Sequence, residues 1–433
     1  MAKEKKKMNL FVKILLWILG ILTGLIALLA LANTICTAID MRTVNALEPV
    51  YMEDQLTPEI DDATGFYTFT TDREFKVMQL SDIHLGSAIL TVDNDKQVIK
   101  TVETMIRAEK PDLVIVTGDA FFPVPQSGTF NNGNELKVFS TMMNKLGVYW
   151  AFAFGNHEYQ GFAYLDEAAL AERLEGCGKY CLFQRGSEAV SGEGNYAINV
   201  KNSDGVITRS FIMLDSHAYL PGDTLGLGEK YDNIHPDQID WYTATLTNLN
   251  ELNKQAILNT KDVKTRQTYS KQFSIIKSFL FFHIPLKEYK TAWENYQNAG
   301  YRNTADTKYI YGYMGEEKAP YIYCGDGEDD LFESVLDFGS TEGIFCGHDH
   351  TNNFSIEYKG VRLTYGLSCD CLVYQNIKHL GAQRGCTLIG CGADGTYTIT
   401  PENYYQPKYD FEGKEEVTMQ TLNEAQEKAQ KNG

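Results

Sequence analysis

The sequence predicts an α/β fold built around a buried, largely parallel sheet and preceded by one membrane-spanning helix. Short β-branched or aromatic runs alternate with helical stretches along most of the chain, as in βαβ units. Several of these runs end directly at Asp, Asn or His, and the carboxyl edge of a parallel sheet is where such side chains meet. The run from Ile14 to Ala32 is uncharged and long enough to cross a bilayer as a helix.

The amino-terminal segment predicts an uncleaved anchor with the rest of the chain outside the cytoplasm. Lys3, Lys5, Lys6 and Lys7 precede the apolar run and Asp40 follows it, which by the positive-inside bias places the amino terminus in the cytoplasm. A cleaved signal peptide is the alternative, because small residues near Ala32 and Ala38 offer cleavage sites.

At 433 residues the chain is long for one domain, but α/β proteins often keep a single core at this length. The expected segments are a cytoplasmic basic segment at 1–13, a transmembrane anchor at 14–33, a linker at 34–72, one large domain at 73–408 and a charged tail at 409–433.

Period-2 and β-branched runs predict the strands, and helical composition with caps predicts the helices between them. The predicted strands are Phe75–Leu80, Leu113–Thr117, Val148–Phe154, Ser210–Asp215, Ser278–Phe282 and Gly343–Cys346. The predicted helices are Asp95–Glu109, Glu135–Leu146, Asp166–Glu175 and Pro236–Lys254. Residues Glu288–Asp330 are rich in Tyr, Asn and Gly without a clean period, which indicates a loop-rich insertion lining a pocket.

Charge and cysteine content limit the partners and the covalent cross-links. A formal net charge of -18 excludes nonspecific nucleic-acid binding, which depends on neutralising phosphates with Lys and Arg. Nine cysteines in an exported chain permit disulfides. Sequence proximity suggests Cys177 with Cys181, and pairs within the group at 369, 371, 386 and 391, while free buried thiols are an equal alternative.

Five short segments carry side chains that suit a pair of divalent cations. The segments are Ser81-Asp82-Ile83-His84, Gly118-Asp119, Gly155-Asn156-His157-Glu158, Phe281-Phe282-His283 and Gly347-His348-Asp349-His350. Asp82 and His84 stand at i and i+2, so they project on the same side of an extended strand end. His348 and His350 repeat that spacing. Asp119 follows a glycine at a tight turn, where one carboxylate can reach two ions, so we expect it to bridge them.

This order of motifs resembles the calcineurin-like metallophosphoesterases, whose signature is D-x-H, G-D, G-N-H-[DE], a lone His and G-H-x-H. The resemblance implies a four-layer α/β/β/α sandwich of two mixed sheets flanked by helices. It also implies that Asp82, His84, Asp119 and His350 hold one ion and that Asp119, Asn156, His283 and His348 hold the other. His157 is then the residue that faces the substrate.

The sequence that flanks the motifs is similar to that of the purple-acid-phosphatase-like branch of the family, with one departure. Purple acid phosphatases carry Tyr three residues after the bridging Asp, whereas this chain has Phe122. Without a phenolate a ferric site is not expected, and Mn²⁺, Fe²⁺ or Zn²⁺ suit the mixed imidazole and carboxylate ligands better than Mg²⁺.

The resemblance implies hydrolysis of a small phosphorylated substrate with a metal-activated hydroxide as nucleophile. His157 is expected to protonate the leaving oxygen or to stabilise its charge, with Glu158 orienting the His157 ring. A phosphomonoester is the expected substrate. A phosphodiesterase or pyrophosphatase acting on a nucleotide or a lipid headgroup is the main alternative, and a catalytically silent binding module stabilised by metal is the remote one. The natural substrate, the metals and the oligomeric state stay open.

Several further polar residues have weaker claims. His217, His235 and His379 are expected not to bind metal. Asp215 closes a predicted strand, so it either faces the pocket or caps a loop. Arg384 can match a phosphate with its guanidinium, although solvation at the surface is the default expectation.

Overall fold

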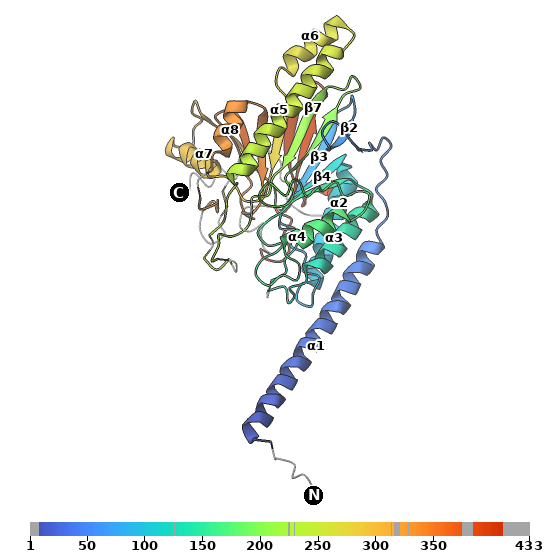
Figure 1. Ribbon diagram of the computed structural model, residues 1–433, viewed down its shortest axis with the longest axis vertical. Helices are drawn as coiled ribbons and strands as arrows, with labels where there is room; N and C mark the ends of the chain where they lie inside the picture. Colours follow the sequence, from blue (N-terminus) through green and yellow to red (C-terminus); the bar gives the residue numbers. More distant parts are fainter. Residues whose placement is uncertain are drawn as a thin grey trace.

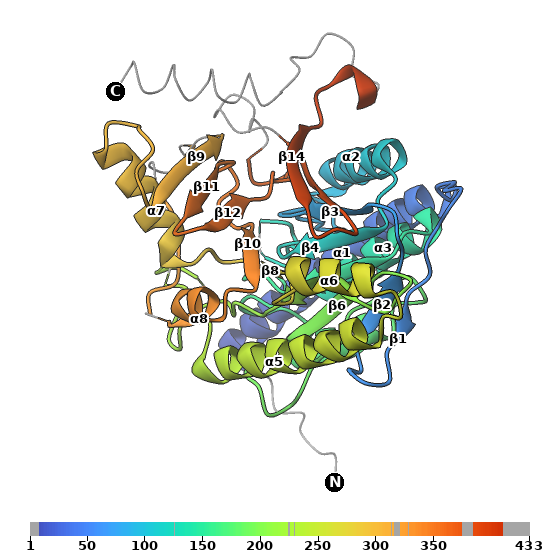
Figure 2. The same ribbon diagram turned by 90° about the horizontal axis from the view of Figure 1, so that it is seen from above.

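A computed structural model describes residues 8–124, 126–223, 226–228, 230–312, 314–315, 321–327, 329–374 and 384–409. Two mixed sheets pack face to face, and helices cover both outer faces (Figures 1 and 2). The predicted four-layer α/β/β/α architecture is therefore confirmed, and the expected tail beyond Tyr409 lies outside the described residues.

The smaller sheet has five strands in the order β14-β13-β3-β4-β5, with β3, β4 and β5 parallel. Its strands are β3 (Phe75–Leu80), β4 (Leu113–Thr117), β5 (Trp150–Ala153), β13 (Gly385–Cys391) and β14 (Tyr397–Asn403). The helices on its side of the molecule are α2 (Val92–Glu109), α3 (Asn132–Leu146) and α4 (Glu167–Glu175). A 3₁₀ turn, η2 (Pro407–Tyr409), ends the described chain.

The larger sheet has nine strands in the order β1-β2-β6-β7-β8-β10-β12-β11-β9, with β7, β8, β10 and β12 parallel. Its strands are β1 (Glu59–Ile60), β2 (Tyr67–Thr70), β6 (Tyr196–Lys201), β7 (Ile207–Met213), β8 (Ser278–Phe281), β9 (Thr307–Tyr311), β10 (Thr341–Cys346), β11 (Ser355–Tyr358) and β12 (Val361–Tyr365). The accompanying helices are α5 (Pro236–Asn259), α6 (Val263–Gln272), α7 (Lys287–Asn298) and α8 (Leu331–Phe338).

Alternation along β8 shows how one strand serves two cores. Phe279 and Phe281 belong to the larger buried cluster, which fills the space between the two sheets and continues through the five-stranded sheet to the apolar faces of α2 and α3 on its outer side. Leu280 points the other way, into a second core formed with α5, α7 and α8. Because successive side chains of a strand point to opposite faces, an unbroken apolar run is what a strand buried on both faces requires.

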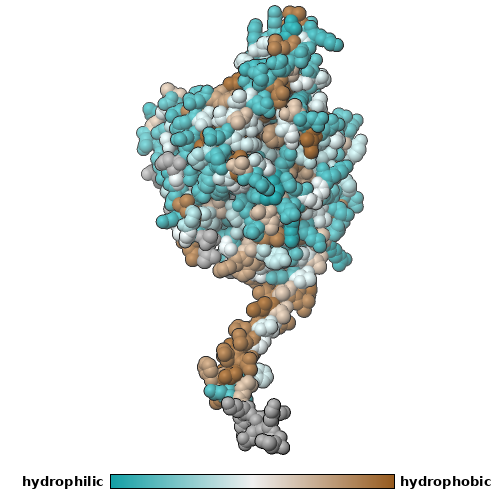
Figure 3. All heavy atoms as spheres, viewed as in Figure 1, coloured by the Kyte–Doolittle hydropathy of each residue, from teal (hydrophilic) through white to brown (hydrophobic). Residues whose placement is uncertain are grey.

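The amino-terminal helix α1 (Leu10–Asn45) is longer than the predicted anchor and contains the first part of the expected linker. Its apolar half extends away from the rest of the molecule, and this helix is the one membrane-span candidate among the described residues (Figures 1 and 3). Cys36, Thr37, Asp40 and Val44 are buried, since their spacing forms one helical face that packs on α2 and α3. The mixed polarity of this stretch is that of an amphipathic helix end.

The expected loop-rich insertion at Glu288–Asp330 is also different in the structure, because it contains α7 and β9. Tyr289, Trp293 and Tyr296 form the buried stripe of α7 at i, i+4 and i+7. Their polar atoms hide a helical period that aliphatic residues would have made plain.

The suggested disulfides are not formed. All nine cysteines lie within the described residues and all are free thiols, most of them buried in the cores. Burial raises the pKa of Cys369 and Cys386 further above the ordinary thiol value, so these side chains pack as small apolar groups.

Candidate dinuclear metal centre

The predicted metal ligands come together at the carboxyl ends of strands from both sheets. Asp82 and His84 follow β3, Asp119 follows β4, and Asn156 follows β5 in the five-stranded sheet. The nine-stranded sheet contributes His283 after β8, and His348 and His350 after β10. The two sheets therefore meet at this site.

The backbone at the site is unusual. Asp82, His84, Asp119 and His348 all have positive φ, at 51°, 53°, 52° and 77°. Non-glycine residues rarely adopt this left-handed region, and each such residue costs about 1–3 kcal/mol where the surroundings enforce it. Its concentration at four of the seven predicted ligands is typical of a functional site.

Two motif glycines permit the loops to approach one another. A Cβ at Gly118 would lie 2.6 Å from His283 Nδ1 and 2.8 Å from Gly155 Cα. A Cβ at Gly155 would lie 2.5 Å from the backbone nitrogen of Asp119. The glycines of G-D and G-N-H are thus needed because these loops pack backbone against backbone.

Two ligand clusters share one carboxylate. Their donor atoms lie within 4.8 Å of one another in each cluster, and the members are Asp82, His84, Asp119 and His350 in the first, and Asp119, His283 and His348 in the second. Asp119 Oδ2 lies 3.5 Å from His84 Nε2 and 3.1 Å from His283 Nε2, so it stands between the clusters. This is the position that a bridging carboxylate must occupy.

Neighbouring groups fix which atoms face the second cluster. His283 donates from Nδ1 to the carbonyl oxygen of Thr117 at 2.8 Å, which leaves Nε2 as the ring nitrogen that faces the site. The Asn156 amide donates to Tyr219 Oη at 2.8 Å, and its Oδ1 lies 3.1 Å from His283 Nε2. Asn156 is thereby placed beside His283 of the second cluster, and its role as a ligand stays a prediction.

A carboxylate that the sequence analysis missed stands behind the first cluster. Asp370 is fully buried, and its Oδ1 lies 3.5 Å from His84 Nδ1, opposite the Nε2 that faces Asp119. Its oxygens also accept the backbone N–H groups of Leu372, Val373 and Tyr374. It follows no predicted strand and belongs to no motif, so no sequence signal marked it.

The charges of the cluster suit cations. Burial alone lowers the pKa of His84, but Asp119 and Asp370 outweigh it and raise this pKa to about 10. Burial also lowers the pKa of His283, but the nearby Asp119 carboxylate outweighs it and raises this pKa to about 9. Burial raises the pKa of Asp119, but the His283 and His157 charges outweigh it and hold this pKa well below its usual range. Buried carboxylates that hold protons on imidazoles in this way form a donor set that fits divalent metal, because a metal ion can take the place of those protons.

His157 lies at the edge of this centre, half-buried in the wall of a cavity. Its Nε2 is 3.9 Å from Asp119 Oδ2, while its Nδ1 bonds to the side-chain oxygen of Gln160. Phe122, which stands where purple acid phosphatases have Tyr, packs on His84 and His157 with ring centroids 4.8 Å from each. Burial is the main reason that the pKa of His157 is lowered to about 4.

The expectation that Glu158 orients His157 is wrong. The Glu158 carboxylate is buried and accepts the backbone N–H groups of Asp119, Ala120, Phe121 and Gly155 at 2.6–3.2 Å. It therefore ties the G-D loop to the G-N-H loop, and Gln160 is the residue in contact with the imidazole.

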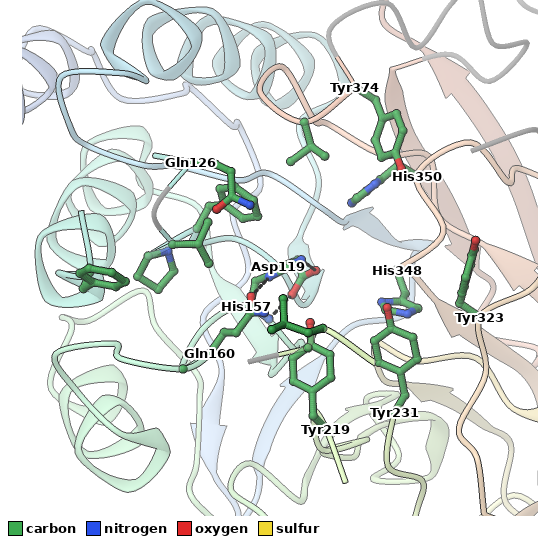
Figure 4. A pocket seen from close by; sticks show the side chains of 18 of the residues that line it. Asp119, Gln126, His157, Gln160, Tyr219, Tyr231, Tyr323, His348, His350 and Tyr374 are labelled. Carbon is green, nitrogen blue, oxygen red and sulfur yellow. Dashed lines mark hydrogen bonds and ion pairs between the residues drawn. The ribbon is translucent and has the colours of Figure 1, made fainter. Parts of the chain in front are cut away.

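The cavity in front of the centre has a volume of about 500 Å³. His157, His348 and His350 mark its polar floor, with Gln126, Gln160, Tyr219 and Tyr231 around them (Figure 4). Apolar side chains make up much of the remaining wall, and they are Phe122, Pro123, Val124, Phe130, Phe162, Leu227 and Val373. A compact anionic group at the floor and an apolar substituent along the wall would both find partners here.

The residues with weaker claims lie elsewhere or serve the scaffold. His217 and His235 stack with centroids 4.1 Å apart beside Asp232, and donor atoms of these three side chains lie within 4.8 Å of one another in a group separate from the two clusters. The expectation that the two histidines bind no metal therefore stays a prediction. Asp215 is buried and accepts the backbone N–H of His217, so it caps a loop rather than lining the cavity. Arg384 is buried, not solvated, and donates to the Asp370 carbonyl oxygen. His379 lies outside the described residues.

Comparison with known proteins places this site in a wider group. A family model described as calcineurin-like phosphoesterase matches residues 75–352. A protein of Arabidopsis thaliana named "Probable inactive purple acid phosphatase 14" is 23% identical over 320 residues, which cover 69% of this chain and 71% of that protein. "Phosphatase DCR2" of Saccharomyces cerevisiae is 27% identical over 330 residues, covering 71% of this chain and 50% of that protein.

Two solved structures are also similar. A dimetal phosphatase from Danio rerio has a TM-score of 0.45 at 10% identity, covering 76% of this chain and 99% of that chain. The purple acid phosphatase PPD1 from yellow lupin seeds has a TM-score of 0.36 at 10% identity, covering 82% of this chain and 55% of that one.

Proposed function

Because this chain belongs to the calcineurin-like phosphoesterase family, we propose that it is a membrane-anchored phosphoesterase that uses two divalent metal ions to hydrolyse phosphomonoesters outside the cytoplasm. The observation that carries the proposal is the pair of ligand clusters sharing Asp119, with His157 beside them on the cavity wall. In this proposal residues 1–13 are cytoplasmic, 14–33 span the membrane and the folded part from 73 to 408 carries the site.

Asp82, His84, Asp119 and His350 would hold one ion, and Asp119, Asn156, His283 and His348 the other. When bound, such ions neutralise phosphoryl oxygens and lower the pKa of bound water to about 7. Mn²⁺, Fe²⁺ and Zn²⁺ suit these imidazole and carboxylate donors. Asp370 and Thr117 act through His84 and His283, because each faces the ring nitrogen turned away from the centre.

His157 is proposed to handle the proton of the leaving group. With Nδ1 on Gln160, the Nε2 atom faces the cavity floor and is neutral near pH 7, given a pKa of about 4. A phosphate dianion next to Nε2 favours the protonated ring, since a nearby opposite charge raises an imidazole pKa. His157 would thus gain its proton as substrate binds and deliver it to the departing oxygen.

The relatives named as inactive support a second candidate, a binding module in which metal only stabilises the fold. A phosphodiesterase is a third, since the cavity leaves room for a second ester substituent. One experiment separates the three: metal-free protein is supplied with Mn²⁺ and assayed on an aryl phosphate and an aryl phosphodiester. Faster turnover of the monoester supports the proposal, faster turnover of the diester supports a phosphodiesterase, and no turnover of either by metal-loaded protein leaves the binding module.

A further inference from the structure

We propose that the cavity opens at the bilayer surface and takes phosphomonoesters of membrane lipids, a substrate class that rests on the proposed phosphatase function and the proposed anchor. The observations that carry this inference are the contacts between α1 and the cavity wall and the apolar mouth of the cavity.

The end of the proposed span touches the loop that forms the cavity wall. Asn33 donates to the carbonyl oxygen of Gly128 at 2.8 Å and accepts the backbone N–H of Ile89 at 3.1 Å. Gly128 lies between Gln126 and Phe130, which both line the cavity. The wall of the cavity is therefore fixed directly to the residue that follows the apolar run.

The length of that run sets the height of the cavity above the bilayer. At 1.5 Å per residue, Ile14–Ala32 spans roughly 28 Å, close to the ~30 Å thickness of a hydrocarbon core. Asn33 and Gly128 then lie at the level of the lipid headgroups. Thr37 and Asp40 hold this arrangement rigid, because Thr37 donates to the Ser87 carbonyl oxygen and Asp40 accepts the Ser87 hydroxyl.

Among the residues that the structure describes, large apolar side chains rather than charged groups lie at the mouth of the cavity. Phe162 and Leu227 are 73% and 84% exposed although both line the cavity, and Phe130 and Val373 are exposed as well. Ile89 and Leu90 lie beside Gly128 and are also exposed. Apolar atoms continue from α1 onto the adjoining underside of the folded part (Figure 3). Exposed aromatic and aliphatic groups next to a membrane helix suit the interface of a bilayer.

The chemistry follows from this placement. The phosphate of the lipid reaches the floor beside His157 while its apolar portion stays along Phe130, Phe162 and Leu227. The bond between phosphorus and the lipid oxygen breaks, an oxygen from water bonds to phosphorus, and the lipid oxygen receives a proton. Inorganic phosphate leaves into the water, and the lipid alcohol remains in the bilayer.

The test uses full-length metal-loaded protein reconstituted in phosphatidylcholine vesicles that contain phosphatidic acid. Phosphate release is measured for the wild type, for an Ile89→Ser, Leu90→Ser double variant, and for Leu258→Ser, a matched exposed leucine on α5. The double variant is expected to lose about tenfold or more on vesicles, while its turnover of a soluble aryl phosphate and all activities of Leu258→Ser remain at the wild-type level.

A second measurement does not depend on the variants folding: wild-type kcat/KM for long-chain phosphatidic acid should exceed that for a water-soluble short-chain analogue. Any one of three results would overturn the inference. The wild type hydrolyses aryl phosphate but not the lipid, or it shows no preference for the long-chain lipid. Alternatively, the folded double variant and the wild type hydrolyse the vesicle lipid at equal rates. If the metal-loaded wild-type protein does not hydrolyse aryl phosphate at all, the proposed phosphatase function itself is refuted.

Discussion

Replacing Glu158 should destabilise the whole centre although this residue binds no proposed ion. Its Oε1 accepts the N–H groups of Ala120 and Phe121, and its Oε2 accepts those of Asp119 and Gly155. Glu158→Gln keeps one acceptor oxygen but turns an amide donor toward two of these N–H groups. Each buried group left without a partner costs about 1–3 kcal/mol, so the two together predict a loss of about 2–6 kcal/mol in the free energy of unfolding.

Denaturant unfolding of the metal-loaded protein measures this loss. Glu158→Ala should lower the free energy of unfolding more than Glu158→Gln, because it removes all four acceptor contacts. This loss approaches the total stability of about 5–15 kcal/mol that is usual for proteins. Glu188→Gln, at an exposed loop position, is the matched control and should change stability by less than about 0.5 kcal/mol. A Glu158→Gln protein within about 1 kcal/mol of the wild type would refute the idea that this carboxylate joins the two loops.

Four further predictions address the metals, the proton donor and the anchor. Asp119→Ala should lose both bound metal and activity, and wild-type metal content measured by elemental analysis would contradict a bridging role. His157→Asn should keep both ions but lose about 10²–10⁴ in kcat, with less loss for substrates whose leaving group is very acidic; an equal loss for all leaving groups would remove the proton-donor role. Metal affinity should rise with pH up to 9–10, because the ions must displace the protons that His84 and His283 hold with pKa values of about 10 and 9. Calorimetry in buffers of different ionisation enthalpy should show that about two protons are released when metal binds. Binding without any proton release would refute this linkage. Removing residues 1–32 should give a soluble protein with unchanged aryl phosphatase activity. Removing residues 1–40 should destabilise the protein, because Cys36, Thr37 and Asp40 are buried. Equal melting temperatures of the two truncated proteins would contradict this role of α1.

The predictable parts of the fold have a simple pattern of apolar residues. Leu113–Thr117 and Ser278–Phe281 are apolar on both faces, which only a doubly covered strand tolerates, so the parallel centre of each sheet could be read directly. The antiparallel strands outside these centres could not be predicted, because β11 and β13 mix Ser, Glu, Gly and Cys with apolar residues and depend on tertiary partners. α7 was missed because tyrosines form its buried stripe.

The site divides in the same way. Motif residues such as Asp119 and His283 were identifiable because their spacing from strand ends is a property of the chain, although their assignment as ligands stays a prediction. Asp370, Tyr219 and Gln160 were missed because each reaches its partner through three-dimensional packing alone, over contacts such as the 2.8 Å bond from Asn156 to Tyr219. Residues that orient ligands carry no local signal, so only the structure could identify them.

Because the proposed ligands are divided between the two sheets, the proposed metal site cannot exist in a half-folded chain. Asp82, His84, Asp119 and Asn156 follow strands of one sheet, whereas His283, His348 and His350 follow strands of the other, and 127 positions along the sequence separate even the nearest pair, Asn156 and His283. A nascent chain therefore offers only weak, partial chelation until the last strands have docked. If these residues bind metal as proposed, the ions are loaded after the two sheets have assembled, and the metals available in the compartment where folding is completed determine which ions are bound.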